Sequence, residues 1–290
     1  MSIFDSAEAL ISASKKNDTP LWQTVQTYAA DEANISAGES WDMMAARLEA
    51  MKQADASYDP AQTSRSGLVG GDAEKMRRAY LNGDTISGGF IGEIISGAVR
   101  MGECNACMHR IVAAPTAGAC GVIPAVLLPY ARRFGTPDAE LIKALYVAAG
   151  FGAVIAARAS ISGAEAGCQA EIGTASAMAA AALVYLHGGS EDMMAHATAI
   201  ALKNLMGLVC DPVAGLVEVP CVKRNVIGAM NALSAAELAL AGITSRIPAD
   251  EVYDAMRSVG LAMSADVRET GEGGIAASPT AQKFKKELLY

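Results

Sequence analysis

Apolar residues recur along this chain at the three- and four-residue spacing that is typical of helices. The clearest face lies between residues 40 and 51, where four apolar side chains follow that spacing: Trp41, Met44, Leu48 and Met51. Ser40 precedes this face and is expected to cap its helix, and Ser190 is expected to cap a later helix that runs to Met206. Similar patterns predict helices at 72–81, 91–101, 124–134, 139–157, 172–186, 190–206, 222–241 and 248–263. Because strand-like alternation is confined to Leu216–Val219, the pattern predicts an all-α fold.

The predicted elements suggest a single compact domain of about ten helices with an N-terminal helical extension. We divide the chain into an N-terminal helical segment (1–60), a main domain (61–280) and a charged C-terminal tail (281–290). The two most apolar runs are Leu141–Ala157, which contains Lys143, and Ala175–Leu186. Both are short for a membrane span, so we expect buried core helices and no membrane partner.

Composition narrows the class of protein. The chain is 52% hydrophobic but only 5% aromatic, so its core must consist largely of small and aliphatic side chains. A net charge of −8 argues against a nucleic-acid partner. The first ten residues include Asp5 and Glu8 and contain no apolar signal-peptide core. The six cysteines are not spaced as a small secreted disulfide scaffold, which favours the reducing cytoplasm.

Three cysteines lie in breaks between predicted helices, each beside Gly or Pro: Cys168, Cys210 and Cys221. Cys168 lies just before one helical pattern and Cys221 opens another. At such helix starts, free backbone N–H groups and the helix dipole stabilise a thiolate. Several thiolates on loops between packed helices suit an iron–sulfur cluster. Three ligands would leave one iron of a cubane open to act as a Lewis acid. The alternative is that all three are small buried apolar residues.

Cys104 and Cys107 form a separate C-x-x-C pair. This pair could be a redox couple or half of a zinc site that Cys120 completes, in which case the chain would be a non-catalytic metal-binding protein. No second C-x-x-C and no well-spaced histidine pair accompanies it. The alternative is that both cysteines share the buried face of a helix.

Two loops of small residues precede predicted helices. Thr116, Ala117 and Gly118 offer backbone N–H groups and a hydroxyl at a helix start, which suits a substrate carboxylate. The Ser/Gly loop at 61–72 could bind an anion in a similar way, although a single Gly-Gly pair is weak support.

Four motifs resemble those of one enzyme family: A-P-T-A-G (114–118), S-I-S-G-A-E-A-G-C-Q-A-E (160–171), L-V-C-D-P-V-A-G-L-V-E-V-P-C-V-K-R-N (208–225) and R-E-T-G-E-G-G (268–274). The chain resembles the alpha chain of the iron–sulfur-dependent L-serine dehydratases (L-serine ammonia-lyases) from about residue 67 to residue 277. The two long motifs are the most specific, and the family's cluster cysteines match Cys168, Cys210 and Cys221.

The resemblance implies a lyase of amino-acid degradation that carries a [4Fe-4S] cluster. L-serine would bind at the iron that lacks a cysteine, and a base would remove its Cα proton. Loss of the hydroxyl gives aminoacrylate, which hydrolyses to pyruvate and ammonia. A cysteine desulfidase that uses the same cluster is the neighbouring alternative.

The resemblance also suggests substrate-binding residues and a partner. Ser160, Ser162 and Asn225 are expected to line the site, with helix capping as their alternative role. Lys223 and Arg224 would neutralise cluster or substrate charge, or would simply be solvated.

Single-chain relatives carry an additional domain with an S-H-T segment, which is absent here. We therefore expect a separate beta chain, a hetero-oligomer, and a base that this partner supplies. The tail lacks the terminal cysteine of some relatives, so blocking of the cluster by the chain's own end is not expected. Arg158 stands where relatives carry Asn, which makes the substrate specificity less secure.

Overall fold

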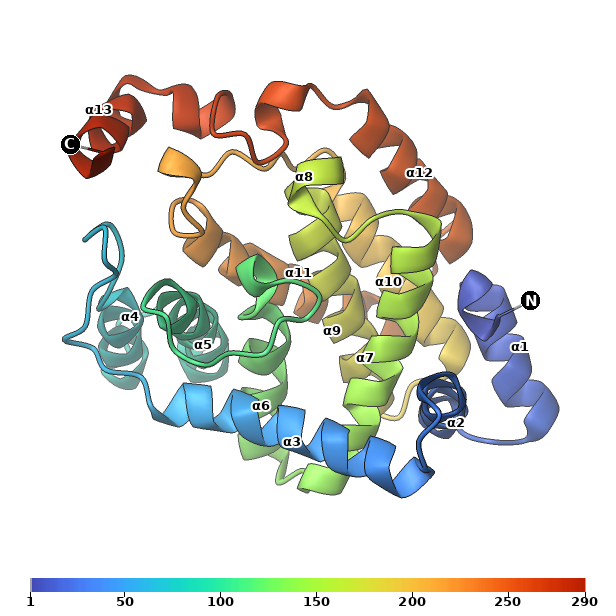
Figure 1. Ribbon diagram of the computed structural model, residues 1–290. Helices are drawn as coiled ribbons and strands as arrows, with labels where there is room; N and C mark the ends of the chain where they lie inside the picture. Colours follow the sequence, from blue (N-terminus) through green and yellow to red (C-terminus); the bar gives the residue numbers. More distant parts are fainter. Residues whose placement is uncertain (1, 290) are drawn as a thin grey trace.

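Two helices lie at the centre of the fold, α7 (Asp138–Arg158) and α9 (Thr174–Leu186), and they pack against each other. We describe residues 2–289 of a computed structural model (Figure 1). The remaining helices are α1 (Ala7–Asn17), α2 (Leu21–Ala33), α3 (Ala37–Ala56), α4 (Asp72–Leu81), α5 (Gly88–Ala106), α6 (Val122–Phe134), α8 (Gly163–Ala166), α10 (Glu191–Leu205), α11 (Cys221–Leu240), α12 (Ala249–Ala262) and α13 (Pro279–Leu289). Residues 2–289 contain no strand, so the predicted all-α class is confirmed.

Helix α9 is buried on every side. The alanines from Ala179 to Ala182 are fully buried, and α9 contacts α6, α7, α10 and α11. Small side chains let four helices surround a fifth closely, which is why a core with so few aromatic residues can be filled.

Helix α7 is the one described helix that is long and apolar enough to cross a membrane. In this fold it is a core helix, because Phe151, Val154 and Ile155 are fully buried and α2, α3 and α9 pack around it. The prediction that 141–157 forms a buried helix is therefore confirmed.

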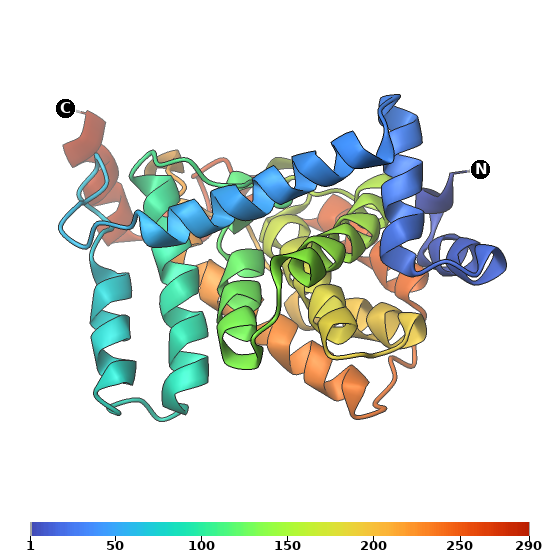
Figure 2. The ribbon, with the colours of Figure 1, turned by 90° about the horizontal axis from the view of Figure 1, so that it is seen from below.

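The N-terminal helices lie on the main bundle. Figure 2 shows α3 crossing the face formed by α5, α6 and α7, which it contacts. The predicted cap of α3 is wrong: the helix begins at Ala37, and Ser36 and Glu39 form a reciprocal capping box. Ser40 lies one turn inside, where its hydroxyl forms a buried 2.8 Å hydrogen bond with the Tyr146 hydroxyl. The proposed division at residue 60 stays a prediction.

Other helix ends agree with the sequence patterns or differ for identifiable reasons. Ser190 caps α10, and α11 begins at Cys221, both as predicted. Helix α4 begins at Asp72, but its N-terminal N–H groups are capped by the buried carboxylate of Glu103, from α5. Helix α5 continues beyond the predicted end to Ala106, because Gly102 does not end the helix: it lies inside it, where a Cβ would lie 3.0 Å from Val222.

Candidate functional site

The three predicted cysteines line one small cavity where the helical turns leading into α9, the segment between α10 and α11, and the start of α11 meet. Cys168 directly precedes a π-helix, Gln169–Gly173, that continues into α9. Cys210 lies in the extended segment after α10, and Cys221 is the first residue of α11. All three side chains are buried. Figure 1 shows these helix starts on one side of the core, below the C-terminal segment that follows α12.

A carboxylate joins the sulfur atoms in this cavity. The Oε2 atom of Glu171 lies 3.9 Å from the Sγ atoms of both Cys168 and Cys210. Among residues 2–289, this is the one place where three Cys, His, Asp or Glu ligand atoms lie within 4.8 Å of one another. Glu171 was not predicted, although it stands three residues after Cys168, at the end of the motif at 160–171. The short distance in sequence between Cys168 and Glu171 was the one signal that could have pointed to this carboxylate.

Gln169 holds the first two cysteine segments together. Its backbone N–H donates to the Leu208 carbonyl at 2.9 Å, and its side-chain carbonyl accepts from the Gly207 N–H at 2.8 Å. These bonds join the start of the π-helix to the segment that carries Cys210. Cysteines that are 42 positions apart therefore come together through backbone contacts that no local pattern reveals.

The C-terminal glycine-rich segment fixes Cys210 from the other side. The Cys210 N–H donates to Val267 O at 2.8 Å, and Cys210 O accepts from the Glu269 N–H at 2.7 Å. Glu269 lines the cavity with a backbone φ of +65°, a conformation that is uncommon for a residue other than glycine. The C-terminal glycine-rich segment therefore packs against the segment that carries Cys210.

A buried ion pair lies beside the cavity. Arg224 Nη2 lies 2.8 Å from Asp211 Oδ1, and both side chains are at most 10% exposed. Asp211 also accepts from the Ile275 N–H at 2.7 Å. At Gly274, a Cβ atom would lie 2.3 Å from the Asp211 carboxylate, so this position needs glycine. In contrast, Lys223 lies on the surface and pairs with Asp72 at 3.3 Å.

Among the three cysteines of the cavity, the surroundings favour the thiolate form most at Cys168. A hydrogen bond from Cys210, followed by the nearby Arg224, lowers the pKa of Cys168. The same hydrogen bond and burial raise the pKa of Cys210, and burial raises the pKa of Cys221 to about 12. Burial also raises the pKa of Glu171. Holding all these groups ionised at once therefore requires a cation.

The structure brings part of the predicted carboxylate-binding loop, Thr116 to Gly118, to the cavity. Gly118 lines it, and the buried Thr116 hydroxyl lies near Glu171 without reaching hydrogen-bond geometry to any residue in 2–289. Ala117, between them, is exposed. Asn225 anchors this loop: its Oδ1 accepts from Gly121 N–H at 2.8 Å, and its Nδ2 donates to Gly118 O at 2.9 Å.

The two predicted serines lie at the edge of this region. Ser160 donates to the Glu165 carboxylate at 2.6 Å and lines a neighbouring hollow, together with Arg268 and Thr270. Ser162 directly precedes α8 and Gly163. A Cβ on Gly163 would lie 2.6 Å from Glu171 Oε2 and 3.0 Å from Cys210 Sγ, so α8 approaches the cysteines closely there.

Two other sequence predictions concern residues away from the cavity. Cys104 lies inside α5, where its thiol donates to Ala54 O, and burial raises its pKa to about 11. Cys120 donates in the same way to Met101 O. Within residues 2–289 no group of three metal-binding side chains forms around this pair, so the zinc alternative gains no support. Arg158 pairs with Asp254 on the surface and does not line the cavity.

Comparison with known proteins decides the family. The sequence profile described as "Serine dehydratase alpha chain" matches residues 16–276.

This chain belongs to the serine dehydratase alpha chain family.

Relatives within the family differ in length. The chain is 45% identical to the "Probable L-serine dehydratase, alpha chain" of Bacillus subtilis, over 99% of this chain and 96% of that protein. It is 44% identical to the "L-serine dehydratase, alpha chain" of Peptoniphilus asaccharolyticus, over 77% of this chain and 76% of that protein. It is 41% identical to "L-serine dehydratase 1" of Escherichia coli, over 70% of this chain but only 46% of that protein. The longer relatives therefore contain a large region without a counterpart here.

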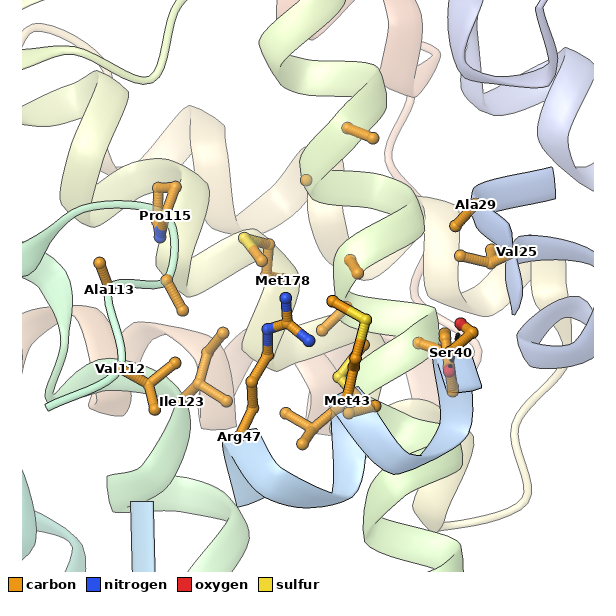
Figure 3. A pocket seen from close by; sticks show the side chains of 18 of the residues that line it. Val25, Ala29, Ser40, Met43, Arg47, Val112, Ala113, Pro115, Ile123 and Met178 are labelled. Carbon is orange, nitrogen blue, oxygen red and sulfur yellow. Dashed lines mark hydrogen bonds between the residues drawn. The ribbon is translucent and has the colours of Figure 1, made fainter. Parts of the chain in front are cut away.

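A hollow much larger than the cysteine cavity lies on the other side of the carboxylate-binding loop. This apolar groove, of about 520 Å³, lies between α2, α3, α7 and residues 112–115 (Figure 3). Its walls include Met43, Ile123 and Met178, and Arg47 extends over it from α3. Arg47 forms no ion pair with any residue in the described range 2–289. The groove contains no cysteine, histidine or carboxylate among its lining residues, so it lacks the donor groups found in the cysteine cavity.

Proposed function

We propose that this chain is the alpha subunit of an L-serine dehydratase, a carbon–nitrogen lyase that converts L-serine to pyruvate and ammonia. The observation that carries this proposal is the meeting of Cys168, Cys210 and Cys221 around one cavity in a chain of this family. We further propose that these three cysteines hold a [4Fe-4S] cluster.

The donor set fits such a cluster. Three buried thiols come from three separate segments, and two of them lie where helical backbone begins. Thiolates are the usual ligands of iron–sulfur clusters, and the iron cations supply the positive charge that this group of ionisable side chains needs. When bound, the cluster would supply a Lewis acid that makes the substrate hydroxyl a better leaving group.

The chain's own residues would bind and orient the substrate. We propose that the loop formed by Thr116, Ala117 and Gly118 binds the L-serine carboxylate through its N–H groups and the Thr116 hydroxyl, which lacks a partner in residues 2–289. Asn225 would keep this loop in position through its two hydrogen bonds. Ser160 and Ser162 would line the approach, and Arg224 would offset negative charge beside Cys168.

We propose that a separate beta chain completes the site and supplies the base that removes the Cα proton. Two lines of support are the alpha-chain names of the full-length relatives and the extra length of the relative from Escherichia coli. The working enzyme would then be a cytoplasmic hetero-oligomer.

Anaerobic reconstitution with iron and sulfide tests the proposal, with and without the beta chain. We expect a broad thiolate-to-iron absorption band and pyruvate from L-serine only when the partner is present. A cluster that releases sulfide from L-cysteine but forms no pyruvate from L-serine would instead favour the desulfidase. Absence of iron and sulfide after reconstitution would overturn the cluster assignment.

A further inference from the structure

Glu171 occupies a position that suggests a direct role in binding the metal. We propose that its carboxylate is the non-cysteine ligand of the group held by Cys168, Cys210 and Cys221 when substrate is absent. This inference rests on the proposed function, because it needs the cluster to be present.

Geometry is the first support. One oxygen of Glu171 is equally close, at 3.9 Å, to two sulfur atoms that come from different segments of the chain. Cys221 lines the same cavity, so the carboxylate faces the space that the three sulfurs share. The π-helix contributes to this arrangement, because it carries Glu171 and begins directly after Cys168. Such wide helical turns are found frequently at functional sites.

The surroundings hold the carboxylate against the sulfurs. On one side, α8 comes so close that a Cβ on Gly163 would lie 2.6 Å from Oε2. On another, a Cβ on Gly118 would lie 3.5 Å from Oε1. These two glycines therefore leave room for the carboxylate, while their backbones limit where it can move.

Charge is the second, independent support. Within residues 2–289, Glu171 forms no salt bridge: the nearby Arg224 is engaged by Asp211 and by the Val209 carbonyl. A half-buried carboxylate beside thiolates and without a cation is disfavoured. An iron ion would satisfy this carboxylate and the cysteine sulfurs together. Glu269 differs, since it lines the same cavity but is exposed.

Mössbauer spectroscopy of the full-length chain tests the assignment, with ⁵⁷Fe placed selectively at the iron that lacks a cysteine. We expect a distinct spectrum for this iron in the wild type, a changed one in Glu171→Gln, and an unchanged one in Glu269→Gln. In Glu171→Cys, the labelled iron should come to resemble the other three, because all four would then have sulfur ligands. Adding L-serine to the wild type should change the spectrum of the labelled iron.

The possible results distinguish an error in the assignment of Glu171 from an error in the proposed cluster. A normal cluster with an unchanged labelled iron in Glu171→Gln would overturn the assignment of Glu171 and leave the proposed function intact. If Glu171→Gln forms no cluster, Glu171→Cys decides: an iron that still differs from the other three overturns the assignment, and four equivalent irons support it. Absence of a cluster in the wild type itself would instead overturn the proposed function.

Discussion

The cysteine cavity and the apolar groove lie on either side of the same loop, yet they differ in almost every property. The groove is the larger space by far, and its walls are mostly aliphatic and methionine side chains. The cavity is small and contains three thiols and two carboxylates. The donor groups of this fold therefore converge in its smaller space and not in its larger one. The comparison predicts that substitutions in the two regions will affect different measurements.

The largest effect is expected for Cys168→Ser. Removing one of three proposed thiolate ligands should lower cluster content and pyruvate formation by roughly 100-fold or more, since even outer-shell changes cost 10–100-fold. Iron and sulfide analysis with the visible spectrum measures this loss. Cys120→Ser is the matched control, because Cys120 is equally buried but lies outside the cavity. Equal cluster loss in both variants would show that burial and not ligation is responsible.

The next effect concerns the ion pair beside the cavity. Arg224→Leu leaves the Asp211 carboxylate buried without its cation, and should reduce the free energy of unfolding by about 3–5 kcal/mol. Urea denaturation of the apo chain measures the change. Arg158→Leu removes the more exposed pair with Asp254 and should cost no more than about 1 kcal/mol. Similar losses in the two variants would contradict the special importance of the buried pair.

A smaller effect is expected where α8 approaches the cysteines. Gly163→Ala places a methyl group against Glu171 and Cys210, and should weaken iron retention roughly 10-fold, as outer-shell changes do. Competition with a chelator measures the retention of iron. Gly89→Ala is the control, because a Cβ there would meet nothing within 4 Å. If both alanines retain iron like the wild type, the close approach of α8 does not constrain the site.

The smallest effect on the cluster should come from the groove. Tyr146→Phe removes the hydrogen bond with Ser40 and should lower stability by about 1–3 kcal/mol, because the Ser40 hydroxyl stays buried without that partner. Adding Ser40→Ala should recover part of the loss. Thermal denaturation gives the stabilities, and the cluster spectrum should be unchanged in both variants. A changed spectrum would show that the two regions are coupled through the loop between them.

Sequence patterns were sufficient where local chemistry decides the structure. Ser190 caps α10 and Cys221 opens α11, because capping side chains and prolines act on their immediate neighbours. The prediction that Ser40 caps α3 was wrong, because its hydroxyl forms a hydrogen bond with Tyr146, a residue far along the chain. The same limit applies to the site: the three cysteines could be singled out, but Glu171 became visible only once the segments met.

The link between Cys210 and the C-terminal segment has a consequence for biosynthesis. Val267 and Glu269 form hydrogen bonds with the backbone of Cys210, but they leave the ribosome well after Cys210 does. A nascent chain therefore carries all its cavity cysteines before the segment that fixes one of them exists. The cavity can take the form described here only after residues 267–269 have been synthesised.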